Sequence, residues 1–344
     1  MPETTTLRVL ENQSLKAFNT FAIDANARYF VPARSDEELR AALGAKEFRG
    51  LPRLILGGGS NLLLTRDFDG VVIHIELMGR SVLRRDEDAT YVQACAGENW
   101  HQFVLWTLDQ GLAGLENLSL IPGTVGACPI QNIGAYGVEM EEVFEELATI
   151  EVASGDEQRF DRAACRFAYR DSIFKHEGKD RFVITRVVFR LPHKSPARLQ
   201  YGELRAELAH MGVSNPTPRQ VSDAVCNIRR RKLPDPAQIG NAGSFFKNPI
   251  VERSVFNRLH AAHPALPHYA AAEGRVKLPA AWLIEQAGWK GKTVGRAGVH
   301  AQHALVLVNR GDAQGDEIKA LAEAIRQSVQ DKFAVQLQPE PIIV

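Results

Sequence analysis

The distribution of apolar and polar residues along the chain predicts a mixture of strands and helices without internal repeats. Short runs that alternate or stay apolar are typical of strands, whereas apolar residues spaced roughly three to four apart are typical of helices. The expected strands are residues 28–33, 51–56, 71–77, 91–96, 147–152, 181–191 and 304–308, and a final strand carries Gln338, Pro339 and Glu340. The expected helices are residues 99–110, 217–232, 251–262 and 279–286, with two more that begin at Ser35 and Asp316.

Capping residues mark several of these helix starts. Ser35 is followed by Glu38 at the spacing of a capping box. Thr217 precedes Pro218 in the favoured order of a cap followed by a proline. The same helix ends in residues 229–232, RRRK, and cations at a helix C-terminus suit the helix dipole. This basic end is either a solvated helix terminus or a binding site for a phosphorylated substrate.

The order of elements divides the chain into three parts and predicts the α+β fold class. Residues 1–77 form a β-α-β unit that ends in a glycine turn and a further strand. Residues 78–225 are mainly strands, and residues 226–344 combine helices with a buried strand. Because the chain has 344 residues and 45% apolar composition, such parts can bury well-developed cores.

The glycine turn at residues 57–61, GGGSN, joins two strands. A Rossmann fingerprint requires a third glycine at the next position and a helix directly after it, whereas Leu62 stands there and a strand pattern follows. Successive backbone N–H groups could instead form an anion nest for a pyrophosphate, with Ser60 and Asn61 as additional donors. A plain glycine turn explains the same residues equally well.

Residues 121–137, IPGTVGACPIQNIGAYG, are rich in glycine and too irregular for a helix or a strand. The glycines at 123, 126, 134 and 137, with Gly114 upstream, allow positive φ and close approach of the backbone to a ligand. Gln131 and Asn132 supply amide donors and acceptors that suit a polar heterocycle. The segment therefore predicts a ligand cradle, and a buried loop whose glycines relieve crowding is the alternative.

Charge and cysteine content exclude several classes of protein. Lys plus Arg and Asp plus Glu both number 41, so the net charge gives no attraction for nucleic acid or an anionic membrane. The N-terminal residues lack an apolar core of secretory length, and runs such as 304–308 are too short to span a bilayer. Cys95, Cys128, Cys165 and Cys226 are far apart, which fits neither a zinc site nor a disulfide framework. We expect a cytoplasmic protein with reduced, mostly buried thiols.

Three further motifs carry candidate chemistry. Residues 243–249, GSFFKNP, place a hydroxyl, an ammonium and an amide beside aromatic rings, which is unusual for a simple turn. Residues 291–293, GKT, resemble the end of a phosphate-binding P-loop, but Gln286 stands where its partner glycine is required. His300 and His303 have metal-ligand spacing, yet no carboxylate or thiolate follows closely and a strand begins at once. No metal is expected.

The segments that carry a family resemblance are GGGSN (57–61), GENWH (97–101), GLENLSLIPGTVGACPIQNIGAYG (114–137), CRFAYRDSIFKH (165–176), KLPDP (232–236), NAGSFFKNP (241–249) and the terminal Pro339 and Glu340. Taken in order, they strongly resemble one family, the UDP-N-acetylenolpyruvoylglucosamine reductases, which are flavoenzymes of peptidoglycan precursor synthesis. The match begins at residues 19–21 and runs nearly to the C-terminus, and residues 201–204, YGEL, resemble the longer type of this family.

The resemblance implies a vanillyl-alcohol-oxidase/PCMH-like FAD-binding domain in two parts, residues 1–77 and 78–225, followed by an α+β substrate-binding domain, residues 226–344. It implies non-covalent FAD and NADPH as the hydride donor. The implied FAD contacts are Gly57, Gly58, Gly59, Ser60, Asn61, Leu62, Pro122, Gly123, Thr124, Gly126, Ala127, Ile130, Gln131, Asn132, Gly134, Ala135 and Tyr136.

The implied reaction reduces the enolpyruvyl ether of UDP-N-acetylglucosamine to the lactyl ether. NADPH gives a hydride to the flavin, which passes it to the terminal carbon of the double bond, so negative charge develops on the adjacent carbon and its carboxylate. By resemblance, Ser244 protonates that carbon, while Arg170 and a protonated Glu340 stabilise the charge. Because serine is a weak acid, we infer that Lys232 or Lys247 assists it.

The resemblance also implies the remaining contacts. The diphosphate and sugar would bind Tyr201, Asn248, Lys232 and Arg229, and Tyr169 would line the site. His303 stands where relatives carry glutamine, so no substrate contact is assigned to it. We expect a monomer whose partner is the small-molecule substrate UDP-N-acetylglucosamine enolpyruvate, with no nucleic acid or membrane partner.

Two other functions are compatible with an FAD-type cradle. A flavin-dependent oxidase acting on a sugar lactone or alcohol would use the same fold, but its reduced flavin would react fast with oxygen. A nucleotide-binding regulator would keep the cradle and lose turnover. The presence of Arg170, Ser244 and Glu340 argues against the regulator.

Overall fold

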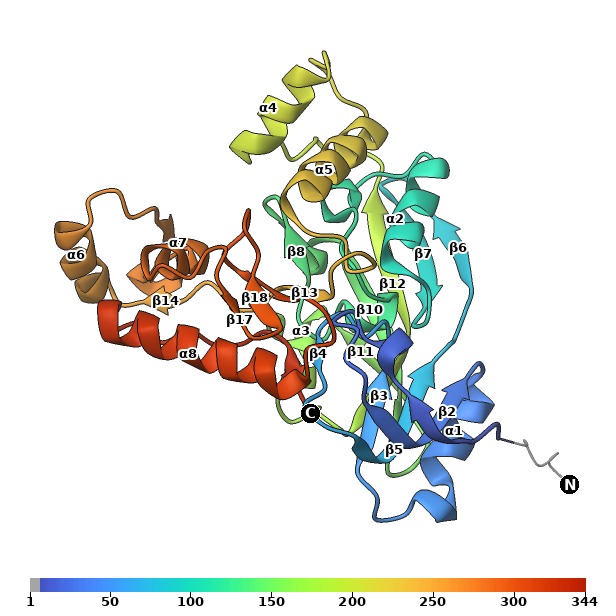
Figure 1. Cartoon of the computed structure of the whole chain (residues 1–344). Coiled ribbons are helices and arrows are strands. Elements are labelled where there is room, and N and C mark those ends of the chain that lie inside the picture. Colours follow the sequence, from blue (N-terminus) through green and yellow to red (C-terminus); the bar gives the residue numbers. More distant parts are fainter. Residues whose placement is uncertain (1–6) are drawn as a thin grey trace, which may run out of the picture. The chain divides into compact units, whose positions relative to one another are not determined.

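The computed structural model describes residues 7–344, and the chain divides into two compact units that are each discontinuous in sequence (Figure 1). Unit 1 contains the chain up to Gln13, Ala27–Gly58 and Asp69–Arg231, and unit 2 contains Ser14–Asn26, Gly59–Phe68 and Lys232–Val344. These limits differ from the boundaries expected at residues 77 and 225, and a helix continues through residue 225. The three-part division therefore stays a prediction.

The first sheet of unit 1 has the strand order β1-β2-β5-β3 and confirms the expected β-α-β pattern. Its strands are β1 Leu10–Ser14, β2 Asn26–Ala33, β3 Arg53–Leu56 and β5 Phe68–Ile75, and helix α1 spans Asp36–Gly44. The capping box is formed, because Glu38 N donates to Ser35 Oγ at 3.1 Å and Arg34 N donates to Glu38 Oε2 at 2.7 Å. The glycine turn at 57–61 follows β3 directly.

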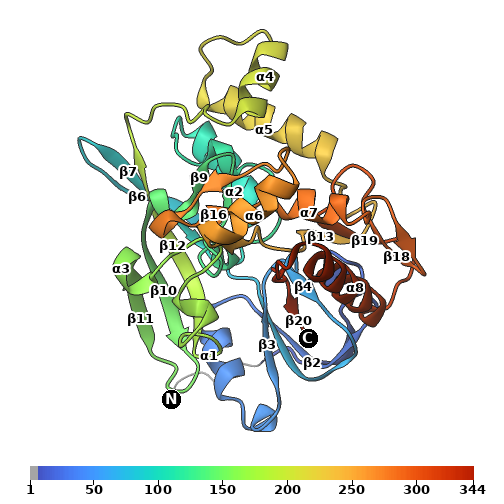
Figure 2. The same cartoon turned by 90° about the vertical axis from the view of Figure 1, so that its left-hand side faces the viewer.

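The second sheet of unit 1 has the order β11-β10-β12-β7-β6, with antiparallel pairing between neighbouring strands (Figure 2). The strands are β6 Arg80–Arg85, β7 Ala89–Cys95, β10 Phe144–Glu151, β11 Glu157–Asp161 and β12 Phe182–Pro192. The sequence pattern does not reveal β6, because this edge strand is mostly charged and exposed and so shows no apolar alternation.

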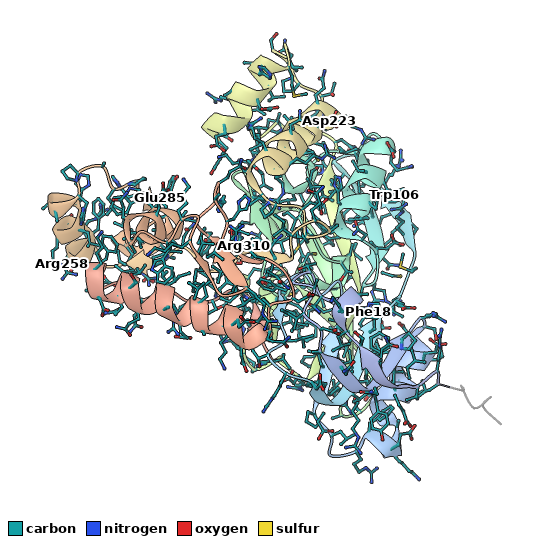
Figure 3. All side chains as sticks on the ribbon, in the orientation of Figure 1. Phe18, Trp106, Asp223, Arg258, Glu285 and Arg310 are labelled. Atoms are coloured by element: carbon teal, nitrogen blue, oxygen red, sulfur yellow. The ribbon has the colours of Figure 1, made fainter. Side chains whose placement is uncertain are left out.

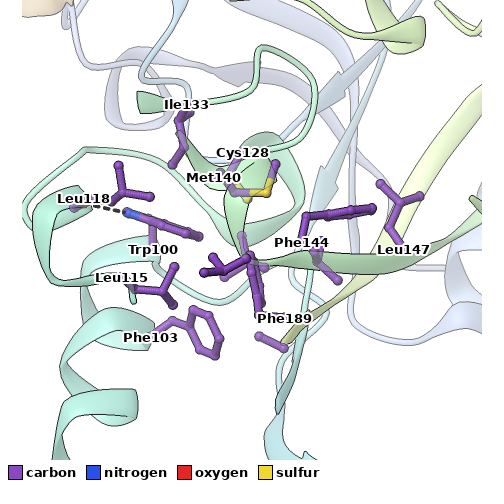
Figure 4. Packing of buried hydrophobic residues seen from close by; sticks show 14 of the residues in the cluster. Trp100, Phe103, Leu115, Leu118, Cys128, Ile133, Met140, Phe144, Leu147 and Phe189 are labelled. Atoms are coloured by element: carbon purple, nitrogen blue, oxygen red, sulfur yellow. Dashed lines mark hydrogen bonds between the residues drawn. The ribbon is translucent and has the colours of Figure 1, made fainter. Parts of the chain in front are cut away.

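A buried apolar cluster joins this sheet to helix α2, Trp100–Asp109, and to the cradle segment (Figure 4). Asn99 caps α2, since Gln102 N donates to Asn99 Oδ1 at 3.0 Å. Trp100 and Phe103 of α2 are fully buried, which confirms that they belong to the core. Cys128 of the cradle packs in the same cluster, so the cradle rests directly on the core of unit 1.

Helices α4, Gly202–His210, and α5, Pro218–Lys232, pack on each other through a separate apolar cluster. The start of α5 is capped as expected, because Gln220 N donates to Thr217 Oγ1 at 3.3 Å. The sequence pattern does not indicate a helix at α4, where Leu204 and Leu208 are the buried apolar positions. Asp223, labelled in Figure 3, lies on the exposed side of α5.

Unit 2 contains a sheet of order β13-β19-β18-β17, a small sheet of order β14-β16-β15 and three longer helices. The helices confirm the predicted ones. Its sheets and helices are β13 Asn241–Ser244, β14 Ile250–Val251, β15 Tyr269–Ala270, β16 Val276–Lys277, β17 Thr293–Val294, β18 Ala297–Val299, β19 Val306–Asn309, α6 Arg253–Ala262, α7 Ala280–Gln286 and α8 Gly315–Phe333.

The last strand lies later than expected. Residues 338–340 do not form a strand, although Pro339 makes an isolated bridge with Phe246, and β20 spans Ile342–Ile343, parallel to β4 Leu62–Leu63. Prolines at 339 and 341 lack the N–H that a ladder requires, which explains the interruption. Glu340 is consequently held between a bridge and a strand.

The remaining elements are short and connect the larger ones. In residues 7–344, no helix is both long and apolar enough to cross a membrane. The short elements are β8 Gly134–Ala135, β9 Val138–Glu139, α3 Arg162–Cys165, and the 3-10 turns Lys16–Phe18, Lys46–Phe48, Glu116–Leu118, Val125–Ala127, Met140–Glu142, Ile173–Lys175 and Ala272–Gly274.

Candidate active site

The cradle is aligned by the segment that precedes α2. Residues 96–100 run antiparallel to residues 123–126, with an isolated bridge between Asn99 and Thr124. The GENWH motif therefore acts as a backbone template for the cradle, which is a role that the sequence analysis missed. The hydrogen bonds run from Trp100 N to Gly123 O (3.0 Å), from Val125 N to Glu98 O (2.9 Å) and from Gly126 N to Ala96 O (2.9 Å).

The glycine turn and the cradle are predicted to hold the same cofactor. In unit 1 the two segments lie in contact. A Cβ on Gly58 would lie 3.0 Å from Gly123 Cα, and a Cβ on Gly57 would lie 2.7 Å from Thr124 Oγ1. The two backbones thus touch where side chains would separate them. Residues 122–124 remain at least partly exposed, so this junction offers ligand-accessible backbone of the kind that a dinucleotide requires.

Asn132 does not present its amide to a ligand, which corrects the role expected for this side chain. It is fully buried, and Glu141 N donates to its Oδ1 at 3.1 Å. Its Nδ2 donates to Glu139 Oε2 at 3.0 Å and to Ala168 O at 3.3 Å. The amide therefore fixes the shape of the cradle, and only the backbone of Asn132 can face a cofactor.

Arg170 is attached to the cradle. Its Nη2 donates to Gly134 O at 2.7 Å and its Nη1 to Asn132 O at 3.4 Å. The guanidinium also lies 5.2 Å from the ring centroid of Tyr169. Arg170 has a left-handed φ of 55°, so the backbone is strained at the residue that carries this side chain. The structure thus brings the predicted catalytic arginine to the predicted cofactor loop.

Tyr136, assigned to the cofactor from the sequence, lies among the predicted substrate residues. Its ring meets Tyr201 edge to face, with centroids 5.3 Å apart. Burial raises the pKa of Tyr136 to about 12, and the nearby charge of Arg229 opposes this rise. Burial lowers the pKa of Arg229, whereas Tyr136 and Cys226 raise it. Both of these neighbours are neutral near pH 7, and a desolvated cation suits an anionic partner.

In unit 2, the end of the glycine turn adjoins the C-terminal segment. Asn61 Nδ2 donates to Glu340 O at 3.2 Å, and Ile342 N donates to Asn61 O at 3.0 Å. Gly59 has a φ of 58°, and a Cβ there would lie 2.0 Å from Phe18 O, so this position requires glycine for packing. Leu62 is buried in β4, which leaves its backbone as the part that can face a cofactor.

Unit 2 also brings Ser244 and Glu340 onto neighbouring segments. Ser244 ends β13, which pairs with β19 at Val306. Glu340 N donates to Phe245 O at 2.8 Å, directly beside Ser244 in the chain. Phe245 is fully buried, so it anchors both segments in the core of the unit.

Two neighbouring polar residues show how this part of unit 2 is held. Asn241 is buried, and its Nδ2 donates to Pro234 O at 3.2 Å, which ties the KLPDP segment and Lys232 to the GSFFKNP loop. Asn248 Oδ1 accepts from Ala280 N at 2.9 Å in the first turn of α7. Asn248 therefore has a structural partner for its amide oxygen, and its predicted contact with a substrate stays a prediction.

The thiols serve packing. Burial raises the pKa of Cys128 well above the usual range and that of Cys165 to about 12, and the four cysteines are free. Cys128, Cys165 and Cys226 are buried, as expected, whereas Cys95 is half-buried. Within residues 7–344, no His, Cys, Asp and Glu side chains gather in a group of three or more that could hold a metal ion.

Comparison with known proteins identifies the family. A protein named UDP-N-acetylenolpyruvoylglucosamine reductase from Burkholderia multivorans is 53% identical over 99% of this chain and 98% of the relative. The chain belongs to the UDP-N-acetylenolpyruvoylglucosamine reductase family. Proteins with the same name from Paraburkholderia phytofirmans and Pseudomonas aeruginosa are 55% and 53% identical, and cover 95% and 97% of this chain and 95% and 98% of their own lengths.

Two domain families match separate parts of the chain, and each part contains some of the predicted site residues. Residues 27–161 match an FAD binding domain, and residues 235–344 match the C-terminal domain of UDP-N-acetylenolpyruvoylglucosamine reductase. The first match contains the glycine turn and the cradle, and the second contains Ser244 and Glu340. The expected fold class, an FAD-binding domain with a C-terminal α+β domain, is confirmed, and the chain is a flavin-dependent oxidoreductase by family.

The fold agrees with a solved member of the family. The crystal structure of UDP-N-acetylenolpyruvylglucosamine reductase from Thermus caldophilus superposes with a TM-score of 0.66 and covers 98% of both chains at 22% identity. At this level of identity the likeness concerns the fold alone.

Proposed function

We propose that the chain catalyses the NADPH-dependent reduction of UDP-N-acetylglucosamine enolpyruvate to UDP-N-acetylmuramate in peptidoglycan precursor synthesis. Membership of the reductase family supports this activity. The observation that carries the proposal furthest is the attachment of Arg170 to the carbonyl oxygens of the FAD-type cradle. A cation fixed to a cofactor loop suits a reaction in which negative charge develops beside that cofactor.

The residues of the glycine turn and the cradle fit FAD. Gly57, Gly58, Gly123 and Thr124 bring two backbone segments together without intervening side chains, which suits a pyrophosphate held by N–H groups. When bound, FAD supplies the two-electron carrier between NADPH and the enolpyruvyl double bond. The protein supplies binding, orientation and charge.

Arg170 stabilises the negative charge that develops on the substrate carboxylate. Its cradle bonds run from the two terminal nitrogens in the plane of the guanidinium and fix that plane, so little reorganisation is needed as charge builds. Lys175 Nζ donates to Arg170 O at 3.2 Å and supports the strained backbone from the other side. Arginine suits this position because its planar fork serves cradle carbonyls and substrate together.

Ser244 donates the proton to the substrate carbon, and Glu340 in its protonated form stabilises the developing charge. The Glu340–Phe245 backbone bond supports this pairing of roles, because it holds the two segments in one register. Lys232 or Lys247 lowers the cost of withdrawing a proton from the serine hydroxyl. Lys247 N donates to Gln338 O at 2.9 Å, which supports a fixed place for this lysine near the C-terminal segment.

The UDP part of the substrate binds Tyr201, Arg229, Lys232 and Asn248, and Tyr169 lines the site. The desolvated charge of Arg229 supports an anionic ligand beside Tyr136 and Tyr201. Tyr201 is 44% exposed, so its ring is accessible to a ligand. The basic end of α5 thus acts as an anion site rather than only a solvated helix terminus.

The protein acts as a cytoplasmic monomer with no nucleic acid or membrane partner. The equal numbers of basic and acidic residues, 41 each, support the absence of a polyanion-binding role. The cytoplasmic supply of NADPH and UDP-sugars supports the location.

An anaerobic titration tests this function. NADPH should bleach the flavin absorbance of the purified protein, and UDP-N-acetylglucosamine enolpyruvate should then restore it with formation of UDP-N-acetylmuramate. UDP-N-acetylglucosamine without the enolpyruvyl group is the matched control and should leave the flavin bleached. A flavin that recovers fast in air but ignores the enolpyruvyl substrate would indicate an oxidase and refute the proposal.

A further inference from the structure

Residues 118–120, which lead into the cradle, are held by side chains from two helices. From α2, Trp100 Nε1 donates to Leu118 O at 2.9 Å, which is the dashed line in Figure 4. From α5, Ser222 Oγ shares a hydrogen bond of 2.7 Å with Ser119 Oγ. All of these residues lie in unit 1. The segment is therefore the link between α2 and α5 ahead of the cradle.

Both polar backbone groups of Leu120 form hydrogen bonds with side chains. Its N–H donates to His101 Nδ1 at 3.0 Å, and its carbonyl oxygen accepts from Arg229 Nε at 3.1 Å. Leu120 has a left-handed φ of 59°, which an L-residue adopts only when its surroundings impose it. His101 and Arg229 hold both polar backbone groups of this residue.

The bond from Leu120 defines the state of the His101 ring. Because Nδ1 accepts the N–H, it must be unprotonated, and the ring proton lies on Nε2. Nε2 is 4.0 Å from Cys226 Sγ on α5. Burial lowers the pKa of His101, and the positive charges of Arg230, Arg229 and Arg219 lower it further. These three arginines belong to α5, and each of them favours the neutral ring.

The bond from Arg229 Nε orients a guanidinium that is assigned to the substrate. A guanidinium is planar, so a hydrogen bond at Nε sets the directions of both terminal nitrogens. Those nitrogens lie on the fork that can grip a phosphate with paired hydrogen bonds. The direction of the Leu120 carbonyl therefore controls the aim of the fork.

We infer that His101 is a positioning residue for Arg229, because its Nδ1 holds the N–H of Leu120, and the carbonyl group of the same residue, in the next peptide, holds the arginine. The inference rests on the proposed function in one respect, that Arg229 binds the diphosphate of the UDP-sugar. This inference gives His101, the histidine of the GENWH motif, a role. Neither the predicted cofactor site nor the proposed chemistry uses this residue.

The test compares variants that remove or keep the acceptor. His101→Phe keeps a ring and removes the acceptor, whereas His101→Asn places an amide oxygen near the position of Nδ1. We expect His101→Phe to raise KM for the UDP-substrate and Kd for UDP roughly tenfold, with kcat and bound FAD close to wild type. His101→Asn should restore most of this loss. His193→Phe is the matched control, because His193 bonds to Thr90 at 3.0 Å elsewhere in unit 1 and should leave both constants unchanged.

A double-mutant cycle with Arg229→Ala shows whether His101 acts through the arginine. In the Arg229→Ala background, His101→Phe should weaken UDP binding no further. Additive losses would overturn the inference, as would a loss in His101→Phe that appears as reduced kcat or lost FAD instead of weaker UDP binding. UDP binding is measured by calorimetry and does not depend on turnover. A wild-type protein that binds UDP but reduces no enolpyruvyl substrate would thus refute the proposed reaction while the positioning role is still tested.

Discussion

Arg170 Nη2 and the carbonyl oxygen of Gly134 are 2.7 Å apart, so the predicted catalytic cation is a fixed part of the cofactor loop. A Cβ on Gly134 would lie 3.0 Å from Arg170 Nη1, and the glycine thus makes room for the guanidinium. The predicted cofactor loop and the predicted catalytic cation are consequently held together.

Arg170→Lys should reduce kcat by about two orders of magnitude, because lysine keeps the charge but cannot form the fork on two cradle carbonyls. KM should change little, since the arginine serves the developing charge more than the ground state. Steady-state kinetics at saturating NADPH measure both constants. A lysine variant with wild-type kcat would show that charge alone suffices and that the cradle bonds are incidental.

Gly58→Ala should weaken FAD binding at least roughly tenfold. Its Cβ would meet the backbone of Gly123, with Cα at 3.0 Å and the carbonyl carbon at 3.3 Å, and neither atom can move without shifting the cradle. The measurement is the flavin absorbance that the protein retains after gel filtration. Gly44→Ala at the end of α1 is the control, because nothing lies within 4 Å of a Cβ there. Equal FAD retention by both variants would contradict a cradle formed at this junction.

Ser222→Ala should destabilise the protein by about 1–3 kcal/mol, because it leaves the buried Ser119 hydroxyl without its partner. The Ser119→Ala and Ser222→Ala changes together should cost less than the sum of the single changes, since the pair then leaves no unsatisfied group. Urea unfolding followed by far-UV circular dichroism measures the free energies. Additive losses would show that the hydrogen bond does not couple the cradle approach to α5.

Local patterns predicted the helix caps and the cradle, because the residues that decide them are close in sequence. The predicted caps Ser35 and Thr217 both form, because Glu38 N donates to Ser35 Oγ and Gln220 N donates to Thr217 Oγ1. The resemblance, rather than any pattern, placed Arg170, Ser244 and Glu340 in one mechanism.

The side-chain contacts that the sequence patterns did not predict join residues that are distant in sequence. The partners of the Asn132 amide include Ala168, which lies far along the chain, so an amide in a glycine loop looked free to bind a ligand. His101 meets the Leu120 N–H across a helix and a loop, and no spacing rule predicts that contact. The pairing of Glu340 with Asn61 joins residues 279 positions apart.

The unfolding free energy should fall as pH falls below about 6.5, the usual pKa of histidine, and His101 should account for part of the fall. Burial lowers the pKa of His101 in the folded protein, so the unfolded chain binds the proton first and becomes favoured. The contribution of His101 to stability is fully present above the pKa of the ring in the unfolded chain. It is lost as the pH falls through the lower pKa of the ring in the folded protein. Denaturant unfolding across this range, compared with His101→Asn, measures the contribution. An identical pH profile in the variant would show that His101 does not contribute to the pH dependence of stability.

Ser244→Ala should stop reduction of the enolpyruvyl substrate while leaving flavin reduction by NADPH intact. The variant lacks the serine hydroxyl that is the proposed proton donor to the substrate carbon. Loss of a general acid lowers kcat by roughly two to four orders of magnitude. Anaerobic stopped-flow absorbance separates the bleaching by NADPH from the recovery with substrate. Ser154→Ala, on an exposed turn, should show both phases at wild-type rates. Because the β13 backbone around residue 244 pairs with β19 independently of the hydroxyl, a slow recovery with normal bleaching would locate the defect in proton donation rather than in the fold. Normal recovery in Ser244→Ala would assign the proton to another donor.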